Sequence, residues 1–216
     1  LLVYQWDSLD PNSPNYGKAT PWVAAKNGPI EFFENPFSFS NTITLEKGSK
    51  GKNIMFSYDN LTSNGLMPNS KLTKNTFSLK TNYDLSPKLH TSFYTTLTLQ
   101  DTRGRNTTGY SDNIMSGFRQ WWQTNVDVLA LKDAYFAAAA NPLASNNYGN
   151  VTWNPYNSSD TRPIFWNNPY FQLYESYPTD KRNRSFSTAN ITYDLLDNLS
   201  LTGRVSYDRS DLSIEN

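Results

Sequence analysis

Two nearly identical turns, 110 residues apart, constrain the fold of this chain more than any other feature. One begins with Tyr-Asp-Leu at residues 83–85, and the other begins with Tyr-Asp-Leu at residues 193–195. On both sides of each turn, polar residues alternate with residues that are mostly apolar, small or aromatic. A period of two is typical of a β-strand whose two faces meet different surroundings. The pattern therefore predicts hairpins with one polar face and one apolar face.

The same alternation predicts six strands. They cover residues 37–45, 53–61, 72–83, 89–99, 185–195 and 199–208. The first, third and fifth connections are short and polar, the second is longer, and the fourth runs for about 80 residues. In an antiparallel membrane barrel, short turns lie at one end and long loops at the other, and strands need about 9–11 residues to cross the bilayer. The sequence therefore favours an all-β chain that belongs to a large antiparallel transmembrane β-barrel.

Composition agrees with half-polar strands. Only 37% of the residues are hydrophobic, whereas 15% are aromatic. A membrane barrel has polar side chains on its inner surface and aromatic girdles at the two membrane interfaces, and Tyr83 and Tyr193 are expected in such a girdle. A soluble all-β protein that binds sugars through aromatic rings would have similar totals. No run of about 18 apolar residues is present, so we expect no transmembrane helix.

Charge and cysteine content exclude several classes of function. Lys and Arg together number 19, as do Asp and Glu, so no net basic charge indicates binding to nucleic acid. The chain has no cysteine, which excludes disulfides, cysteine-based metal sites and cysteine nucleophiles. It begins at Leu1 without Met and without a charged leader, so we interpret it as an internal piece of a longer protein.

The expected organisation has four parts. Residues 1–36 form an ordered loop, residues 37–101 four strands, residues 102–183 a long extracellular loop, and residues 184–216 two strands. Loops as long as the third part are uncommon in compact domains and are usually functional. This one is expected to hold two helices, the first capped by Ser111 or Asp112 and running through Gln123, the second covering about residues 125–140.

Residues 115–127, which read Met-Ser-Gly-Phe-Arg-Gln-Trp-Trp-Gln-Thr-Asn-Val-Asp, resemble the SusC/RagA family of TonB-dependent outer-membrane transporters. Further matching pieces follow in the order of the family. They are Phe32-Phe33, Asn64-Gly65 with Pro68-Asn69, Thr152-Trp153-Asn154, residues 166–170 and residues 182–184.

This resemblance implies a barrel of about 22 strands, of which this chain would supply about six early ones. It also implies an N-terminal plug and a TonB-contact segment, neither of which is in this sequence, and a SusD-like surface lipoprotein as partner. The implied function is import of an oligosaccharide or peptide across the bacterial outer membrane, in contact with membrane lipid and without nucleic acid. No bond is made or broken in such import, so the resemblance implies neither an enzyme nor a cofactor.

Five side chains of the long loop are candidates for contact with ligand or partner. They are Arg119, Trp121, Trp122, Trp153 and Trp166. Flat aromatic rings suit sugars, and a guanidinium group binds a carboxylate through two hydrogen bonds. The alternative is that these side chains brace the loop. Adjacent positions on a helix cannot share one face, so one of the two neighbouring Trp residues is expected to pack inward and the other to face outward.

Catalytic and metal-binding alternatives have weaker support. His90 is the only histidine, and one histidine cannot build a histidine-based zinc site. A glycosidase would need two loop carboxylates about 5–10 Å apart, but nothing in the spacing of the loop acids suggests such a pair. Those acids are Asp127, Asp133, Asp160, Glu175 and Asp180, with Asp112 and Asp127 better interpreted as helix caps. Loop oxygens could bind calcium, although no EF-hand spacing is present.

Two classes of function therefore remain. The first is TonB-dependent import through an outer-membrane barrel. The alternative is a soluble, secreted β-sandwich module that binds glycans through loop aromatics. The alternative accounts for the alternation and the aromatic content, but it accounts less well for the strict order of short and long connections. Six strands in an open sheet would also leave unpaired edges, so we do not expect the chain to fold alone.

Overall fold

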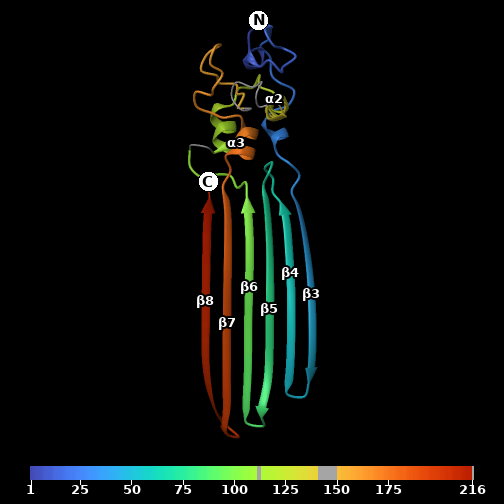
Figure 1. Ribbon diagram of the computed structural model, residues 1–216, viewed down its shortest axis with the longest axis vertical. Coiled ribbons are helices and arrows are strands. Elements are labelled where there is room, and N and C mark those ends of the chain that lie inside the picture. Colours follow the sequence, from blue (N-terminus) through green and yellow to red (C-terminus); the bar gives the residue numbers. More distant parts are fainter. Residues whose placement is uncertain (111–112, 141–149, 216) are drawn as a thin grey trace.

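The computed structural model describes residues 1–110, 113–140 and 150–215. Its main body is one antiparallel sheet of six long strands, paired in the order of the sequence (Figure 1). The strands are β3 (Phe37–Ser49), β4 (Lys52–Asn64), β5 (Lys71–Ser86), β6 (Leu89–Arg103), β7 (Thr179–Leu196) and β8 (Leu199–Glu215). The prediction of a mostly-β, antiparallel architecture with six strands is confirmed. The sheet is open, because within the described residues β3 and β8 pair on one side only.

Each strand is longer than the alternation predicted. The first hairpin turn contains only residues 50–51, and the long connection shortens to residues 104–178 because β7 begins at Thr179. Residues 179–184 contain no apolar side chain, yet they pair along their whole length with β6 and β8. A pattern of alternating hydrophobicity detects only the part of a strand that has an apolar face. The polar extensions are held by backbone pairing instead.

The two faces of the sheet differ in character. On one face Phe77 stacks on Tyr58 of the neighbouring strand, with ring centroids 4.9 Å apart, and Leu79 pairs with Phe56. On the opposite face the residues are largely Ser, Thr, Asn and charged, and they form hydrogen bonds across the strands. Examples are Thr42 with Asp59, Asn190 with Ser92, and Thr192 with Thr202. We call these the apolar face and the polar face.

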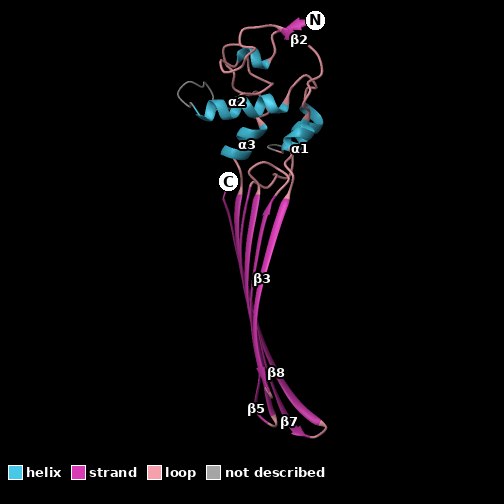
Figure 2. Cartoon of the chain, turned by 90° about the vertical axis from the view of Figure 1, so that its right-hand side faces the viewer, coloured by secondary structure: helices cyan, strands magenta, loops and turns pink. Residues whose placement is uncertain are grey.

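All three tight turns lie at one end of the sheet, and the longer connections lie at the other (Figures 1 and 2). The described parts of residues 1–36 and 104–178 fold together at that second end, and we call them the loop layer. Its elements are β1 (Leu2–Val3), η1 (Trp6–Leu9), β2 (Thr20–Pro21), η2 (Pro29–Phe32), α1 (Ile114–Ser116), the π-helical turn η3 (Gly117–Trp121), α2 (Val128–Ala140) and α3 (Pro169–Glu175). Residues 1–36, expected to be loop, therefore contain four short elements.

The helices of the loop layer differ in part from the prediction. The second expected helix is α2, which starts at Val128, after the side chain of Asp127 has accepted hydrogen bonds from the backbone N–H groups of Leu129 and Ala130. The first expected helix is wrong in its bounds. It begins at Ile114 with Asn113 as its cap, and its π-helical continuation ends at Trp121. Residues 111–112, the expected caps, lie outside the described residues.

Helix α3 was missed because seven residues are too few to establish a helical period. Its start has a clear physical cause. The side chain of Asn168 accepts a hydrogen bond from the N–H of Tyr170, and Pro169 occupies the first turn, where no N–H is needed. Asn168 also donates to the carbonyl groups of Leu131 and Val151, both at 2.9 Å. One buried amide therefore connects α3, α2 and the segment between them.

The buried hydrophobic residues gather in the loop layer rather than on the sheet. One cluster contains Phe32, Ile114, Val128, Tyr135, Tyr170 and Leu173, and a second contains Trp6, Val126, Leu131, Ala134 and Trp153. Backbone hydrogen bonds from Ala25 to Thr124 (2.8 Å) and from Val128 to Asn27 (3.0 Å) join the N-terminal segment to the long loop. The loop layer is thus a small packed unit built from two distant parts of the chain.

The two repeated turns meet at the only histidine. Asp84 and Asp194 lie on either side of His90, with distances of 2.6 Å from Nδ1 to Asp84 and 3.2 Å from Nε2 to Asp194. The backbone N–H of each aspartate also donates to the preceding hairpin turn, at Gly51 and Lys88 respectively. The aspartate of each Tyr-Asp-Leu sequence therefore has the same structural role, which is to connect its hairpin turn to the neighbouring one.

Gly104 provides a test of how closely the loop layer approaches the connection between β4 and β5. Its φ is 66°, and a Cβ atom there would lie 2.7 Å from the backbone oxygen of Asn69. We expect Gly104→Ala to cost about 1–2 kcal/mol from the left-handed conformation alone, and more from the backbone contact. Thermal unfolding of the protein measures the loss of stability. Gly17→Ala is the control, since φ there is 69° but no atom lies within 4 Å. Equal losses of stability in the two variants would contradict the close approach of Gly104 to Asn69.

Candidate functional site

Three aromatic side chains form a cluster on the loop layer that remains accessible. The rings of Trp121 and Trp166 are stacked at 28° with their centroids 6.4 Å apart, and Tyr110 meets Trp166 edge-on at 5.8 Å. Trp121 is 49% exposed and Tyr110 is also exposed. Gly117 makes room for the cluster, because a Cβ atom at this position would touch the ring of Trp166 at 3.4 Å. We call these three residues the aromatic platform.

Trp122 and Trp153 support this platform from the interior. Trp153 is only 7% exposed, and its indole N–H donates to the backbone oxygen of Trp121 at 3.1 Å. The half-buried ring of Trp122 lies 4.9 Å from that of Trp153 and 5.2 Å from that of Phe118. The neighbouring Trp residues thus face different surroundings, as expected. For Trp122 and Trp153 the contacts favour the bracing role that was the alternative to ligand contact.

Trp166 is held by a clamp that the sequence did not suggest. The side chain of Asn154 accepts hydrogen bonds from the backbone N–H groups of Phe165 and Trp166, at 3.1 and 3.0 Å, and donates to the carbonyl of Trp166 at 2.8 Å. Thr152 donates to the same carbonyl at 2.8 Å. Residues 152–154 and 165–166, although separate in sequence, therefore form a single structural unit that fixes the backbone at Trp166.

Arg119 lies on the π-helical turn between Gly117 and Trp121. Its side chain is exposed, and within the described part of the chain it forms no ion pair. A guanidinium group without a carboxylate partner keeps its donors available for an acidic ligand or partner. The same short turn carries the exposed ring of Trp121, so a charged group and an aromatic ring are offered two residues apart on one segment.

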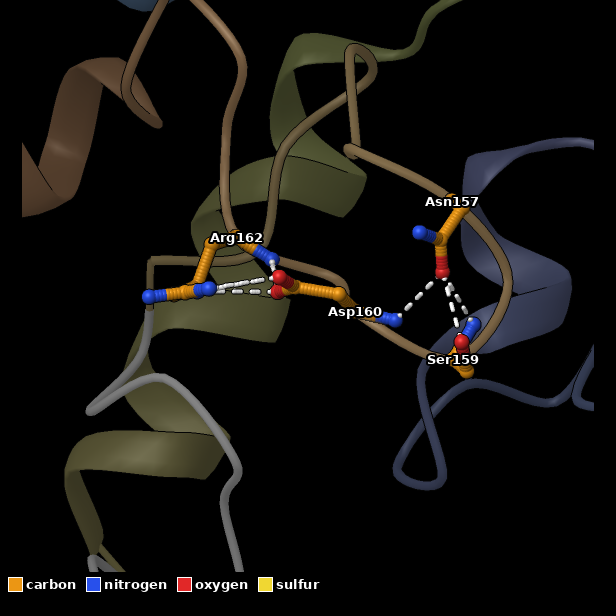
Figure 3. A network of polar contacts seen from close by, with 4 residues as sticks. All are labelled: Asn157, Ser159, Asp160 and Arg162. Atoms are coloured by element: carbon orange, nitrogen blue, oxygen red, sulfur yellow. Dashed lines mark hydrogen bonds and ion pairs between the residues drawn. The ribbon is translucent and has the colours of Figure 1, made fainter.

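The loop carboxylate Asp160 belongs to a local network rather than to a catalytic pair. It accepts three hydrogen bonds from the guanidinium of Arg162, with a shortest distance of 2.6 Å. Asn157 holds the turn by accepting from the backbone N–H groups of Ser159 and Asp160 (Figure 3). These bonds stabilise the charged carboxylate, so the pKa of Asp160 falls to about 2. A carboxylate that stays charged is unsuited to act as a general acid.

Other loop acids also have structural partners. Glu175 accepts a hydrogen bond of 2.7 Å from the hydroxyl of Tyr135, and Asp127 caps α2. Asp180 is buried and forms an ion pair with Arg105 at 2.9 Å. Within the residues that the structure describes, no group of three or more His, Cys, Asp and Glu side chains is arranged to hold a metal ion. Among the sequence-predicted site residues, Trp121 and Arg119 are the ones left exposed.

Comparison with protein-family models finds no match for this chain, and comparison with curated proteins finds none either. Among the described helices, none combines the length and the hydropathy that a membrane-crossing helix requires. Function is therefore inferred from the geometry of the sheet and of the loop layer.

Proposed function

We propose that this chain is part of a transmembrane β-barrel of the bacterial outer membrane, of the SusC/RagA type, which imports a large oligosaccharide or peptide. Energy comes from TonB through a segment outside this sequence, and a SusD-like lipoprotein delivers the ligand. One observation carries the proposal. Residues paired across neighbouring strands form rows that run across the sheet, and the apolar side chains form a band that crosses the apolar face at an angle to these rows. Such a band is what we expect where strands cross a membrane at a tilt, with their apolar side chains facing lipid.

The direction of the band follows from three rows of paired residues. The row farthest from the tight turns reads Phe37, Asn64, Lys71, Arg103, Thr179 and Glu215 from β3 to β8. A middle row reads Leu45, Phe56, Leu79, Thr95, Ser187 and Tyr207. A row near the turns ends in Leu89, Tyr193 and Leu201. Apolar residues thus lie far from the turns on β3 and close to them on β8.

The slope of the band gives a strand tilt. The band occupies alternate positions of residues 37–45 on β3 and of residues 199–207 on β8, so its centres are Asn41 and Gly203. The row of Asn41 reaches β8 at Asp211, eight residues from Gly203 (211 minus 203). At about 3.3 Å per residue and about 4.8 Å per strand, this drift over five strand steps corresponds to a tilt of roughly 45°. Strands of membrane barrels tilt by about 35–45°.

The residues at the edges of the band suit a membrane interface. Tyr83 and Tyr193 occupy the same face near the tight turns, and the ammonium group of Lys52 lies 4.6 Å from the centre of the Tyr83 ring. Amphipathic aromatic rings and snorkelling Lys side chains favour this depth. In a closed barrel the polar face then lines the lumen. The tight turns lie on the periplasmic side, and the loop layer lies outside the cell.

The loop layer supplies the surface for partner and ligand. Its hydrophobic clusters and its clamp at Asn154 give it a fixed shape, while Tyr110, Trp121 and Trp166 remain accessible. Stacking on a preformed aromatic surface suits the apolar faces of sugar rings and costs little ordering entropy. This arrangement supports ligand capture at the extracellular mouth of the barrel, followed by passage through the polar lumen.

Membrane fractionation tests the proposal. We expect the full-length protein that contains this chain to appear in the outer-membrane fraction, to need detergent for extraction and to co-purify with a lipoprotein. Cells lacking the protein, or lacking TonB, should lose uptake of the same nutrient. A water-soluble protein that binds glycans without membrane or lipoprotein would overturn the transporter and favour the secreted β-sandwich module.

The platform yields a separate prediction. We expect Trp121→Ala to weaken binding of the imported ligand about fivefold, since one aromatic stacking partner contributes on the order of 1 kcal/mol. Titration of the purified transporter and lipoprotein complex with its ligand measures the change. Phe136→Ala is a suitable control, because that aromatic side chain is similarly exposed on α2 but lies outside the platform. Equal affinities for both variants would exclude Trp121 from the binding site.

A further inference from the structure

Positive side chains gather on the polar face of the sheet, toward the end that carries the loop layer. Lys74 on β5 and Arg182 on β7 lie in one row, separated by Gln100 on β6. Arg184 lies two residues further along the same face of β7. We call Lys74, Arg182 and Arg184 the cationic site. They line an open pocket of about 570 Å³, and their uncharged neighbours in it are Thr98, Gln100 and Ser210.

The charges of this pocket do not cancel. Asp208 is the single carboxylate among its lining residues, and both of its oxygens accept hydrogen bonds from Arg184, at 3.0 and 2.7 Å. Lys74 and Arg182 form no ion pair within the described residues. Three cations and one anion leave two positive charges without a partner. Arg184, paired with Asp208, forms one wall of the pocket.

Two other carboxylates on the same face have partners outside the pocket. Asp59 on β4 accepts hydrogen bonds from Thr42 at 2.6 Å and from Ser57 at 3.3 Å. Asp180, nearer the loop layer, is buried against Arg105. Among the described residues, Asp208 is thus the one carboxylate that lines the pocket with Lys74 and Arg182, and an acidic ligand would meet these cations directly.

The position of the cationic site relative to the apolar band places it in water. On the opposite face of the same part of β8, Arg209 and Asp211 form an ion pair at 3.0 Å, and Lys181 lies on that face of β7, paired with Ser213, two residues beyond Asp211. Charged residues on both faces mean that the band has already ended here. With the orientation proposed above, this level is the extracellular mouth of the lumen, directly beneath the loop layer.

Building on the proposed import function, we propose that the cationic site binds acidic groups of the imported nutrient, and we infer that this nutrient is an oligosaccharide with carboxylate or sulfate substituents. Arg and Lys are the usual ligands of such groups. Lys74 and Arg182 are two strand spacings apart, or about 10 Å, which suits a chain with repeated charges better than a single ion. Thr98, Gln100 and Ser210 offer hydrogen bonds to sugar hydroxyl groups.

Two matched double variants of the full-length transporter test this inference. Lys74→Gln with Arg182→Gln removes two charges from the polar face of β5 and β7. Lys71→Gln with Lys181→Gln removes two charges from the opposite face of the same strands. Binding is measured with tetragalacturonate, with a sulfated heparin tetrasaccharide and with neutral maltotetraose, each at low and at moderate salt. The presence of each variant in the outer membrane is determined in parallel.

We expect the wild-type protein to bind at least one acidic probe more tightly than maltotetraose, in a salt-dependent manner. The polar-face variant should lose at least tenfold in affinity for that probe, whereas the opposite-face variant should keep it. Equal affinity in all three proteins, or preference for the neutral probe, would overturn the cationic site and leave the transporter intact. Absence of the wild-type protein from the outer membrane would overturn the proposed function, and the acidic substrate with it.

Discussion

In the proposed barrel, replacing Leu79 by Arg should prevent assembly of the protein into the outer membrane. Leu79 lies in the middle row of the apolar band, where it pairs with Phe56 on β4 and Thr95 on β6. An Arg side chain facing lipid near the middle of the bilayer costs about 2–4 kcal/mol, a large part of the stability of a typical domain. The amount of full-length protein that resists extraction from outer membranes without detergent measures the effect.

Ser78→Arg is the matched control for this experiment. Ser78 is the preceding residue on the same strand, and it lies on the polar face between Ser57 and Thr96. In a barrel it points into the water-filled interior, so the variant should assemble like the wild type. Leu97→Arg and Thr96→Arg repeat the comparison on β6. If both members of each pair assemble equally well, the band does not contact lipid and the barrel proposal fails.

Replacing Phe32 by Ala should open the loop layer. The ring of Phe32 is 1% exposed and meets Phe33, Phe118 and Tyr170 edge-on, with centroid distances of 5.0–5.5 Å. Truncating a buried Phe costs about 3–5 kcal/mol, because transfer free energy is lost and a cavity remains. If cleavage follows transient opening, an exposed loop should be cut at least about 100 times faster, since about 1.4 kcal/mol corresponds to a factor of ten.

Limited proteolysis of the folded protein measures this opening. Ile30→Ala is the control, because Ile30 belongs to the same short element η2 but is 74% exposed. Its truncation should change the cleavage rate less than threefold, in line with the small effect of most surface substitutions. Similar rates for both variants would mean that the N-terminal segment does not stabilise the long loop.

The alternation of residues was sufficient to predict the sheet. A period of two needs only a strand with one apolar face, and that condition holds in all six strands over the part that carries the apolar band. The prediction failed where this condition ended. Residues 179–184 are polar throughout, so the start of β7 was placed six residues too late. Helix α3 was missed because its start depends on Asn168, a cap that any Asn-rich loop could offer.

The candidate site was predicted less completely than the sheet. The sequence indicated that Trp121 and Trp122 face different ways, but it could not tell which ring remains accessible. That depends on Trp153, whose indole N–H binds the backbone of Trp121 from 32 residues away. Tyr110 and the clamp at Asn154 carried no recognisable signal, since both act through contacts between segments distant in sequence.

The sequence by itself determined the strands, their order and the two kinds of face, because these follow from local alternation and from the lengths of the connections. Only the tertiary structure decided the register between strands. Register is set by backbone pairing across the sheet, and it turns separate apolar runs into a diagonal band. Register also brought Lys74, Arg182 and Arg184 into one pocket, and it brought the two repeated aspartates to His90.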